Sequence, residues 1–159
     1  MKSNVIKKQS RTLHRKVSTI VMLPLLVTTL SGIGYRLGRS WFGGSDTFGR
    51  WMMTLHEGRY LGRSLVPFYV LLVGLGLIGL LATGIVMVLA RRRSTSQRAS
   101  KQNSRWFHRI LAPIATLPIL ATVLTGMGYR LGRSWFGLSD AQAEILMTIH
   151  QGSWLGSTL

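Results

Sequence analysis

The sequence predicts an all-α membrane protein with three transmembrane helices, external amphipathic helices and a tandem duplication of one helical unit. Three observations lead to this class. The 159 residues are 47% hydrophobic and only 15% charged. Three long stretches carry no charge, and much of the first half of the chain recurs at a fixed offset of 94 residues. About 20 helical residues cross a bilayer core. Because lipid offers no hydrogen-bond partners, the backbone within it must bond to itself, and such stretches therefore form helices.

Charge and cysteine content narrow the possible classes of function. The chain has 20 Lys and Arg against 4 Asp and Glu, a net charge of +16. A soluble nucleic-acid-binding domain has such charge without the apolar bulk, and a disordered chain lacks apolar residues, so both classes are excluded. The absence of cysteine excludes disulfides, iron–sulfur clusters, thiolate zinc sites and covalently attached haem. Any redox cofactor is therefore expected to be held by His or Met.

The expected spans are the three uncharged stretches Val17–Tyr35, Leu65–Ala90 and Ile110–Tyr129. The first is not a cleaved signal peptide, because a near-copy of it recurs in mid-chain. Proline is tolerated in the first turn of a helix and kinks its interior. The expected first-turn prolines are Pro67 and Pro113, and the expected kinks lie at Pro24 and Pro118.

Basic residues indicate the orientation in the membrane. The segment before the first span and the linker between the second and third are short, basic and free of acids. The positive-inside rule places both in the cytoplasm, where they meet anionic lipid. The N-terminus is then cytoplasmic and the C-terminus extracytoplasmic, in a plasma or thylakoid membrane. The expected units are a basic N-terminus (1–13), a first repeat (14–90), a basic linker (91–107) and a second repeat (108–159).

The duplication aligns His14–Leu65 with His108–Leu159 without a gap, and about half of the 52 positions are identical. Each copy opens with His-Arg, continues through a span containing Leu-Pro, and leaves it at Gly-x-Gly-Tyr-Arg. A Ser-Asp turn typical of a helix N-cap follows, and then an amphipathic stretch ending in Met-Thr-x-His-x-Gly. Because both copies start on the same side, we expect parallel repeats about an axis along the membrane normal.

The second copy reaches Leu159, the counterpart of Leu65, where a fourth span would begin. The expected architecture is therefore an incomplete four-helix bundle. We expect a neighbouring chain to cover the open face, in a homo-oligomer or as a subunit of a larger membrane complex. The alternative is that the sequence continues beyond this point.

All four histidines lie in the duplicated unit, as two pairs at an offset of 94. A twofold axis would bring each pair together, one near each membrane face, and two opposed imidazoles are what six-coordinate haem iron requires. Glycines of the spans, Gly32, Gly34, Gly126 and Gly128, would leave room for a flat macrocycle, and arginines would bind its propionates. No catalytic residues are predicted. The expected cofactor-binding residues are His14, His56, His108, His150, Arg15, Arg109, Arg36, Arg39, Arg130 and Arg133, the four histidines as iron ligands.

Other interpretations remain open at this point. Interfacial histidines are common, and a duplication copies useless residues as faithfully as useful ones. Met53 and Met147 suit either axial ligation or packing. The pattern Gly74-x-Gly76-x-x-Gly79 matches a dinucleotide fingerprint, but it lies inside an apolar span with no strand before it, so that function is rejected.

Short motifs around the histidines carry a family resemblance. They are His14-Arg15, Leu23-Pro24 and Ser31-Gly32, and in the second copy His108-Arg109, Leu117-Pro118 and Thr125-Gly126. These motifs resemble the HR…LP…TG helices of PepSY-associated transmembrane proteins. Trp51–Leu61 resembles that family's external W…iHqG element, and Thr83-Gly84 resembles a later helix end. The chain is similar to short cyanobacterial members that lack the PepSY domains and the fourth helix.

The resemblance implies a four-helix membrane unit, and some members of the family are bis-histidine dihaem b-type cytochromes that reduce ferric siderophores. The leading hypothesis is therefore a dihaem membrane cytochrome that carries electrons across the membrane, with a ferric-reductase-like role. His14 and His108 would hold the cytoplasmic haem, and His56 and His150 the external one. The alternatives are a structural or pigment-binding accessory subunit of a photosynthetic or respiratory complex, with chlorophyll on single histidines, and a scaffold without cofactor.

Overall fold

The computed structural model describes residues 2–92 and 104–153, and every regular element in these ranges is a helix. The elements are α1 (Lys2–Trp41), α2 (Asp46–Glu57), the short 3-10 helix η1 (Arg59–Leu61), α3 (Val66–Arg92), α4 (Ser104–Trp135) and α5 (Asp140–Gln151). Among them α1, α3 and α4 are long and apolar enough to cross a membrane. The predicted all-α class with three spans and two shorter helices is confirmed.

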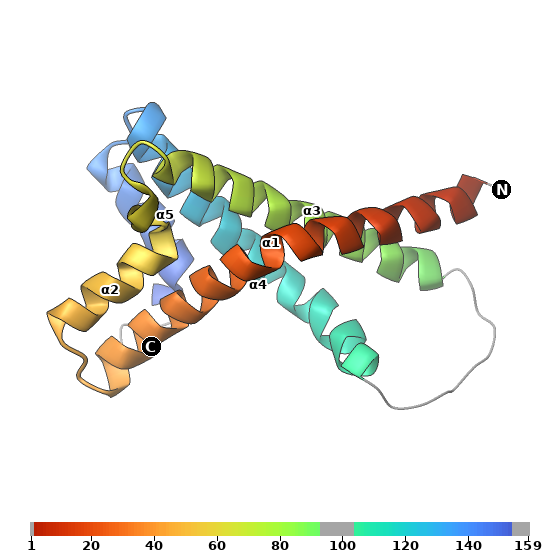
Figure 1. Ribbon diagram of the computed structural model, residues 1–159, viewed down its shortest axis with the longest axis horizontal. Coiled ribbons are helices and arrows are strands. Elements are labelled where there is room, and N and C mark those ends of the chain that lie inside the picture. The colour runs from red at the N-terminus through yellow and green to blue at the C-terminus, as the bar shows by residue number, and fades with distance from the viewer. Residues whose placement is uncertain (1, 93–103, 154–159) are drawn as a thin grey trace.

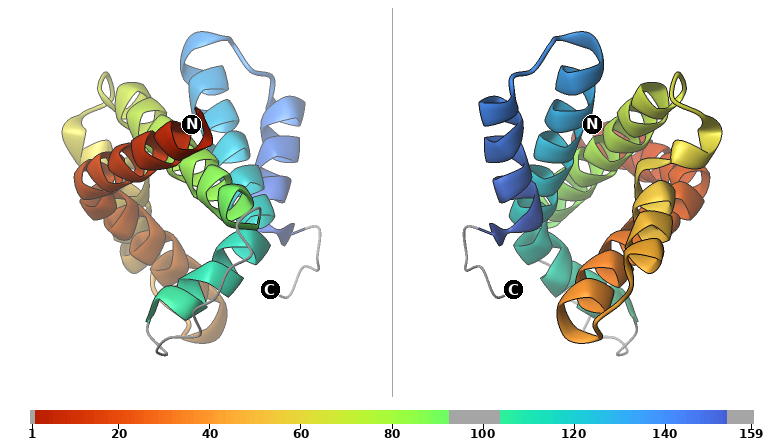
Figure 2. Two further views of the ribbon diagram at one scale, coloured as in Figure 1. Left: turned by 90° about the vertical axis from the view of Figure 1, so that its right-hand side faces the viewer. Right: turned by 90° about the vertical axis from the view of Figure 1, so that its left-hand side faces the viewer.

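The three long helices form the body of the molecule, and α3 packs against both α1 and α4 (Figure 1). The two short helices fold back on the spans that precede them, α2 along α1 and α5 along α4. Both lie at the end of the body away from the N-terminus, and the end-on views of Figure 2 separate the two helical hairpins. Each repeat therefore carries its second histidine back toward its own span.

Glycines on α3 let the other two spans approach it. A Cβ atom at Gly76 would lie 2.5 Å from Cγ1 of Val21 in α1, and one at Gly74 would overlap the sulfur of Met127 in α4. Small residues at such points allow close packing of helices in lipid. Two of the three glycines in the pattern that resembles a dinucleotide fingerprint thus serve helix contacts.

The structure corrects one expectation about the helix starts, the place of Pro113 in a first turn. Helix α1 already begins at Lys2, so most of the basic segment 1–13 belongs to it, and α4 begins at Ser104. Pro67 lies in the first turn of α3 as expected, but Pro113 lies well inside α4, and both α1 and α4 remain continuous through their prolines. An uncharged stretch marks the part of a helix that meets lipid, whereas the helix itself continues into water on charged residues.

Candidate functional site

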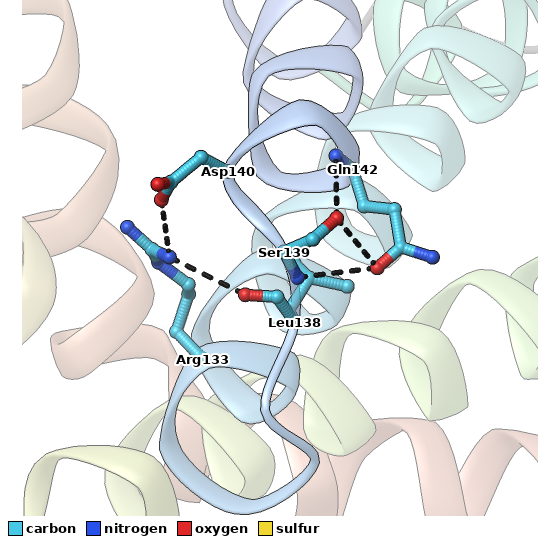
Figure 3. Close-up of polar contacts among 5 residues, drawn as sticks. All are labelled: Arg133, Leu138, Ser139, Asp140 and Gln142. Carbon is cyan, nitrogen blue, oxygen red and sulfur yellow. Dashed lines mark hydrogen bonds and ion pairs between the residues drawn. The ribbon is translucent and has the colours of Figure 1, made fainter.

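The turn between span and short helix is capped as the sequence predicts. The Ser139 hydroxyl accepts a hydrogen bond from the backbone N–H of Gln142 at 3.3 Å, and the Gln142 side chain accepts one from the N–H of Ser139 at 3.2 Å (Figure 3). In the first repeat Ser45 accepts from the N–H of Phe48 at 3.2 Å. These caps satisfy N–H groups that have no partner within the helix, and they fix where α2 and α5 begin.

Two of the arginines expected at haem propionates hold these turns. Arg133 contacts the Asp140 carboxylate at 2.7 Å and donates to the carbonyl of Leu138 at 3.3 Å (Figure 3). Arg39 contacts Asp46 at 2.6 Å in the first repeat. Each arginine therefore ties the end of its span to the start of the following helix.

Each short helix ends one residue after its histidine, and a glycine cap follows. Gly58 caps α2 with φ of 71°, and Gly152 caps α5 with φ of 68°. This left-handed conformation favours glycine and is a common helix end. His56 and His150 therefore lie in the last turn of α2 and α5, at the point where each hairpin has returned to its span.

Glycines of the spans make room for these two imidazoles. A Cβ atom at Gly32 would lie 2.9 Å from both Cε1 and Nδ1 of His56. One at Gly126 would lie 2.8 Å from Cε1 and 3.0 Å from Nδ1 of His150. The sequence suggested that this space would receive a macrocycle, whereas the structure fills it at these two glycines with the histidine rings.

Both rings are oriented by backbone carbonyls. Nδ1 of His56 lies 2.8 Å from the carbonyl oxygen of Thr28, and Nδ1 of His150 lies 2.9 Å from that of Thr122. A carbonyl oxygen only accepts, so each Nδ1 carries the proton and donates it. The same contact therefore leaves Nε2 of each ring with a free lone pair, which is how proteins prepare a metal-binding histidine.

The two rings meet across the repeats. Their centroids are 6.1 Å apart, and their planes are inclined by 60°. Two imidazoles that bind one metal ion at the usual distance of about 2 Å have ring centres about 6 Å apart. The spacing fits a shared metal ion. Within residues 2–92 and 104–153 no group of three or more His, Cys, Asp or Glu could hold a metal.

The environment favours neutral imidazole at His150. Burial lowers the pKa of His150, which lies in α5 outside the spans. The hydrogen bond to Thr122 opposes this effect, and the nearby His56 adds to it. Since only neutral imidazole offers a lone pair, the lowered pKa supports ligand binding.

The histidine predicted at the cytoplasmic face is also oriented. Nδ1 of His14 lies 2.9 Å from the hydroxyl of Thr83 in α3. That hydroxyl already donates to the carbonyl of Gly79 at 2.7 Å, so the histidine is the donor in this contact. His108 and Arg109 lie early in α4, but their side chains fall outside the described part of the structure. The predicted contact between His14 and His108 stays a prediction.

The remaining arginines differ between the repeats. Arg130 lies 3.4 Å from the carboxylate of Glu57, which Arg59 also contacts at 2.8 Å, so this group joins α2 to α4. Its Nε atom is buried and has no hydrogen-bond partner. Arg36, its counterpart, is half-buried, and Arg15 is exposed on α1. Thus Arg130 is paired with the residue that follows His56, whereas Arg15 is exposed.

Several contributors escaped the sequence analysis. Thr28 and Thr122 act through backbone carbonyls, for which side-chain identity gives no signal. Thr83 belongs to the Thr83-Gly84 motif, which does not indicate that its hydroxyl meets a histidine. Glu57 could have been singled out, because it is the one acid adjacent to a histidine in the sequence. Its partner Arg130 lies on another helix, and only the fold shows that the two side chains meet.

The comparisons with known proteins agree with this architecture. The family model described as "PepSY-associated TM region" matches residues 34–156. The chain belongs to this family. With three apolar helices of spanning length, this member of the PepSY-associated family is an integral membrane protein. No curated protein and no solved structure matches the chain.

Proposed function

We propose that this PepSY-associated protein is a b-type cytochrome that carries electrons across the membrane through two non-covalently bound haems. The observation that carries the proposal is the His56–His150 pair, with ring centroids 6.1 Å apart and each Nδ1 on a backbone carbonyl. Two such imidazoles suit the two axial positions of haem iron.

At the external site the chain supplies ligands and charge. His56 and His150 would bind the iron through Nε2, because Nδ1 of each is engaged by Thr28 or Thr122. Arg36 and Arg130 lie one turn beyond Gly32 and Gly126 on the spans and would bind propionates, with Glu57 tempering the charge of Arg130. Bound haem would supply a one-electron ferric–ferrous couple at this face.

At the cytoplasmic site the corresponding ligands would be His14 and His108. His14 is oriented by Thr83, and Arg15 and Arg109 follow the two histidines in the sequence and would meet propionates at this face. With the N-terminus in the cytoplasm, as the basic segments indicate, electrons would pass outward from donor to acceptor. The leading downstream role is reduction of ferric iron outside the membrane.

The absorption spectrum of the detergent-purified chain, oxidised and then reduced with dithionite, tests the proposal. A sharp reduced α-band of b-type haem, at about two haems per chain by extraction, is expected. A chlorophyll spectrum would overturn it in favour of a pigment-binding accessory subunit. A colourless protein after expression with added haem precursor would overturn it in favour of a structural subunit or scaffold.

Variants assign the external haem. His150→Ala should lower the haem content from two to one per chain and remove the bis-imidazole low-spin signal of one site. Gln151→Ala, next to it in the sequence and exposed, is the matched control and should retain both haems. Retention of both haems in His150→Ala would contradict the assignment of this pair.

A further inference from the structure

The four acidic residues of the chain are not used alike. Asp46, Glu57 and Asp140 each form an ion pair with an arginine. Glu144 is exposed on α5 and has no such partner among the described residues. In a chain with 20 basic residues and four acids, an exposed carboxylate without an ion pair is available to a basic partner.

Glu144 borders an apolar hollow on the surface of α5. The hollow is lined by Ala141, Glu144, Ile145, Thr148 and Ile149. Ile145 is 61% exposed and Ile149 is 41% exposed. The face of α5 that packs on α4 is a different one, since it contains His150 and the buried Ala143. The hollow therefore faces away from the hairpin and pairs an acid with exposed apolar side chains.

The equivalent face of α2 has the complementary chemistry. At the offset of 94, Glu144 corresponds to Arg50 and Ile145 to Trp51. Arg50 is exposed, and its side chain bonds only within its own helix, to Thr47 at 3.0 Å. Trp51 is 64% exposed. One repeat thus presents a cation beside a large apolar side chain, where the other presents an anion beside an apolar hollow.

The membrane brings these two faces to the same height. Helices α2 and α5 lie at the same end of the spans (Figure 1). Two copies inserted in the same orientation share one depth in the bilayer, so sideways approach of one copy aligns its α2 with α5 of the other. Arg50 of one copy and Glu144 of the next would then lie at a similar depth.

We propose that the chain assembles with itself through this contact, with α2 of one copy docked on α5 of its neighbour. Arg50 pairs with Glu144 across the interface, and Trp51 covers the hollow at Ile145 and Ile149. Because the two faces differ, the contact is heterologous and generates a ring or a row in the membrane. The proposal needs no cofactor and stands apart from the proposed electron transfer.

Cross-linking tests the contact directly, because the natural chain has no cysteine. Chains carrying Arg50→Cys and chains carrying Glu144→Cys, with different affinity tags, are co-expressed and oxidised in the membrane. Each chain then has one thiol, so any disulfide joins two chains. The matched control pair is Phe42→Cys with Phe136→Cys, at equivalent repeat positions just beyond the ends of α1 and α4 that are 78% and 79% exposed. The Arg50/Glu144 pair should form mixed dimers several-fold faster than the control pair.

Charge exchange provides the second measurement, read as oligomer size in native-like lipid discs. Arg50→Glu should dissociate the assembly, and Arg50→Glu combined with Glu144→Arg should restore it. Mixed cross-linking no faster than the control, or dominant self-linking of Glu144→Cys, would overturn the contact. An unchanged absorption spectrum in all these variants separates this outcome from failure of the haem proposal.

Discussion

The turns that join span to short helix in the two repeats reach one geometry with different residues. In the first turn the ring of Phe48 covers Gly38, and Gly44 stays small because a Cβ there would lie 3.0 Å from that ring. In the second turn Leu138, the counterpart of Gly44, covers Gly132 at 3.1 Å from its Cβ position. The apolar side chain that covers the span glycine therefore comes from the short helix in the first repeat and from the loop in the second.

This exchange changes the cap as well. With Leu138 as the cover, the position of Phe48 is free for Gln142, whose side chain completes a reciprocal cap with Ser139. The first turn has only the serine half of that cap. The residues at these two positions therefore depend on each other. Glutamine at position 48 alone would leave Gly38 without an apolar cover, and leucine at position 44 alone would clash with Phe48.

The contacts of the histidines, in contrast, are the same in both repeats. His56 and His150 each rest on a span glycine and donate to a threonine carbonyl, at 2.8 and 2.9 Å. Packing in the turn is free to vary provided that it returns the histidine to this place. Both hairpins therefore preserve the orientation of the imidazole ring, although the packing of their turns differs.

The largest expected effect comes from filling the space under one imidazole. Gly126→Ala puts a Cβ 2.8 Å from Cε1 of His150 and should break its bond to Thr122. Overfilling of this kind costs about 1–3 kcal/mol, and the external haem should be lost. Imidazole ¹⁵N shifts and haem content measure the change.

The matched control for this variant is Gly128→Ala. A Cβ there would lie 3.5 Å from Leu146, which is ordinary contact, and alanine favours the helix by about 1 kcal/mol. We expect unchanged haem content and equal or higher thermal stability. Equal haem content and equal thermal stability in the two variants would show that the space at Gly126 does not orient the ring of His150.

The next effect tests the exchange between the turns. Gly44→Leu should destabilise the first hairpin by about 1–3 kcal/mol through its clash with Phe48. Phe48→Gln alone should destabilise it by a similar amount, because Gly38 loses its cover. The double variant reproduces the second turn and should approach wild-type stability. Thermal unfolding followed by circular dichroism gives the coupling energy between the two substitutions. If their effects on stability simply add, the two positions do not compensate for each other.

A smaller effect is expected at the link between the repeats. Glu57→Gln copies the residue of the second repeat, Gln151, and removes the carboxylate that Arg130 faces at 3.4 Å. Both side chains are mostly buried, so a loss of about 1–2 kcal/mol is expected, less than for a fully buried pair. Unfolding in mixed detergent micelles measures it. If Arg130→Gln and the double variant lose as much stability as Glu57→Gln, the ion pair accounts for the loss. If the losses of the two single variants add in the double variant, the ion pair is not the cause.

Much of this arrangement could be predicted from the sequence, because a duplication pairs residues by number. It placed His56 opposite His150, and the Ser-Asp motif predicted where α2 and α5 begin. The carbonyls of Thr28 and Thr122 could not be predicted, since every residue has one and only the fold selects which meets a ring. A span glycine such as Gly32 likewise signals close approach without saying what approaches.

The smallest effects are expected at the two surface ion pairs, where the repeats differ in what supports the turn. Asp46 and Asp140 have highly exposed side chains, at 78% and 92%, and such pairs contribute about 0–1 kcal/mol. Asp140→Asn should cost less than Asp46→Asn, because the capping box of Gln142 still holds the start of α5. Hydrogen exchange of the first-turn amides resolves this difference. Protection lost equally in α2 and α5 would show that the reciprocal cap adds nothing to the second turn.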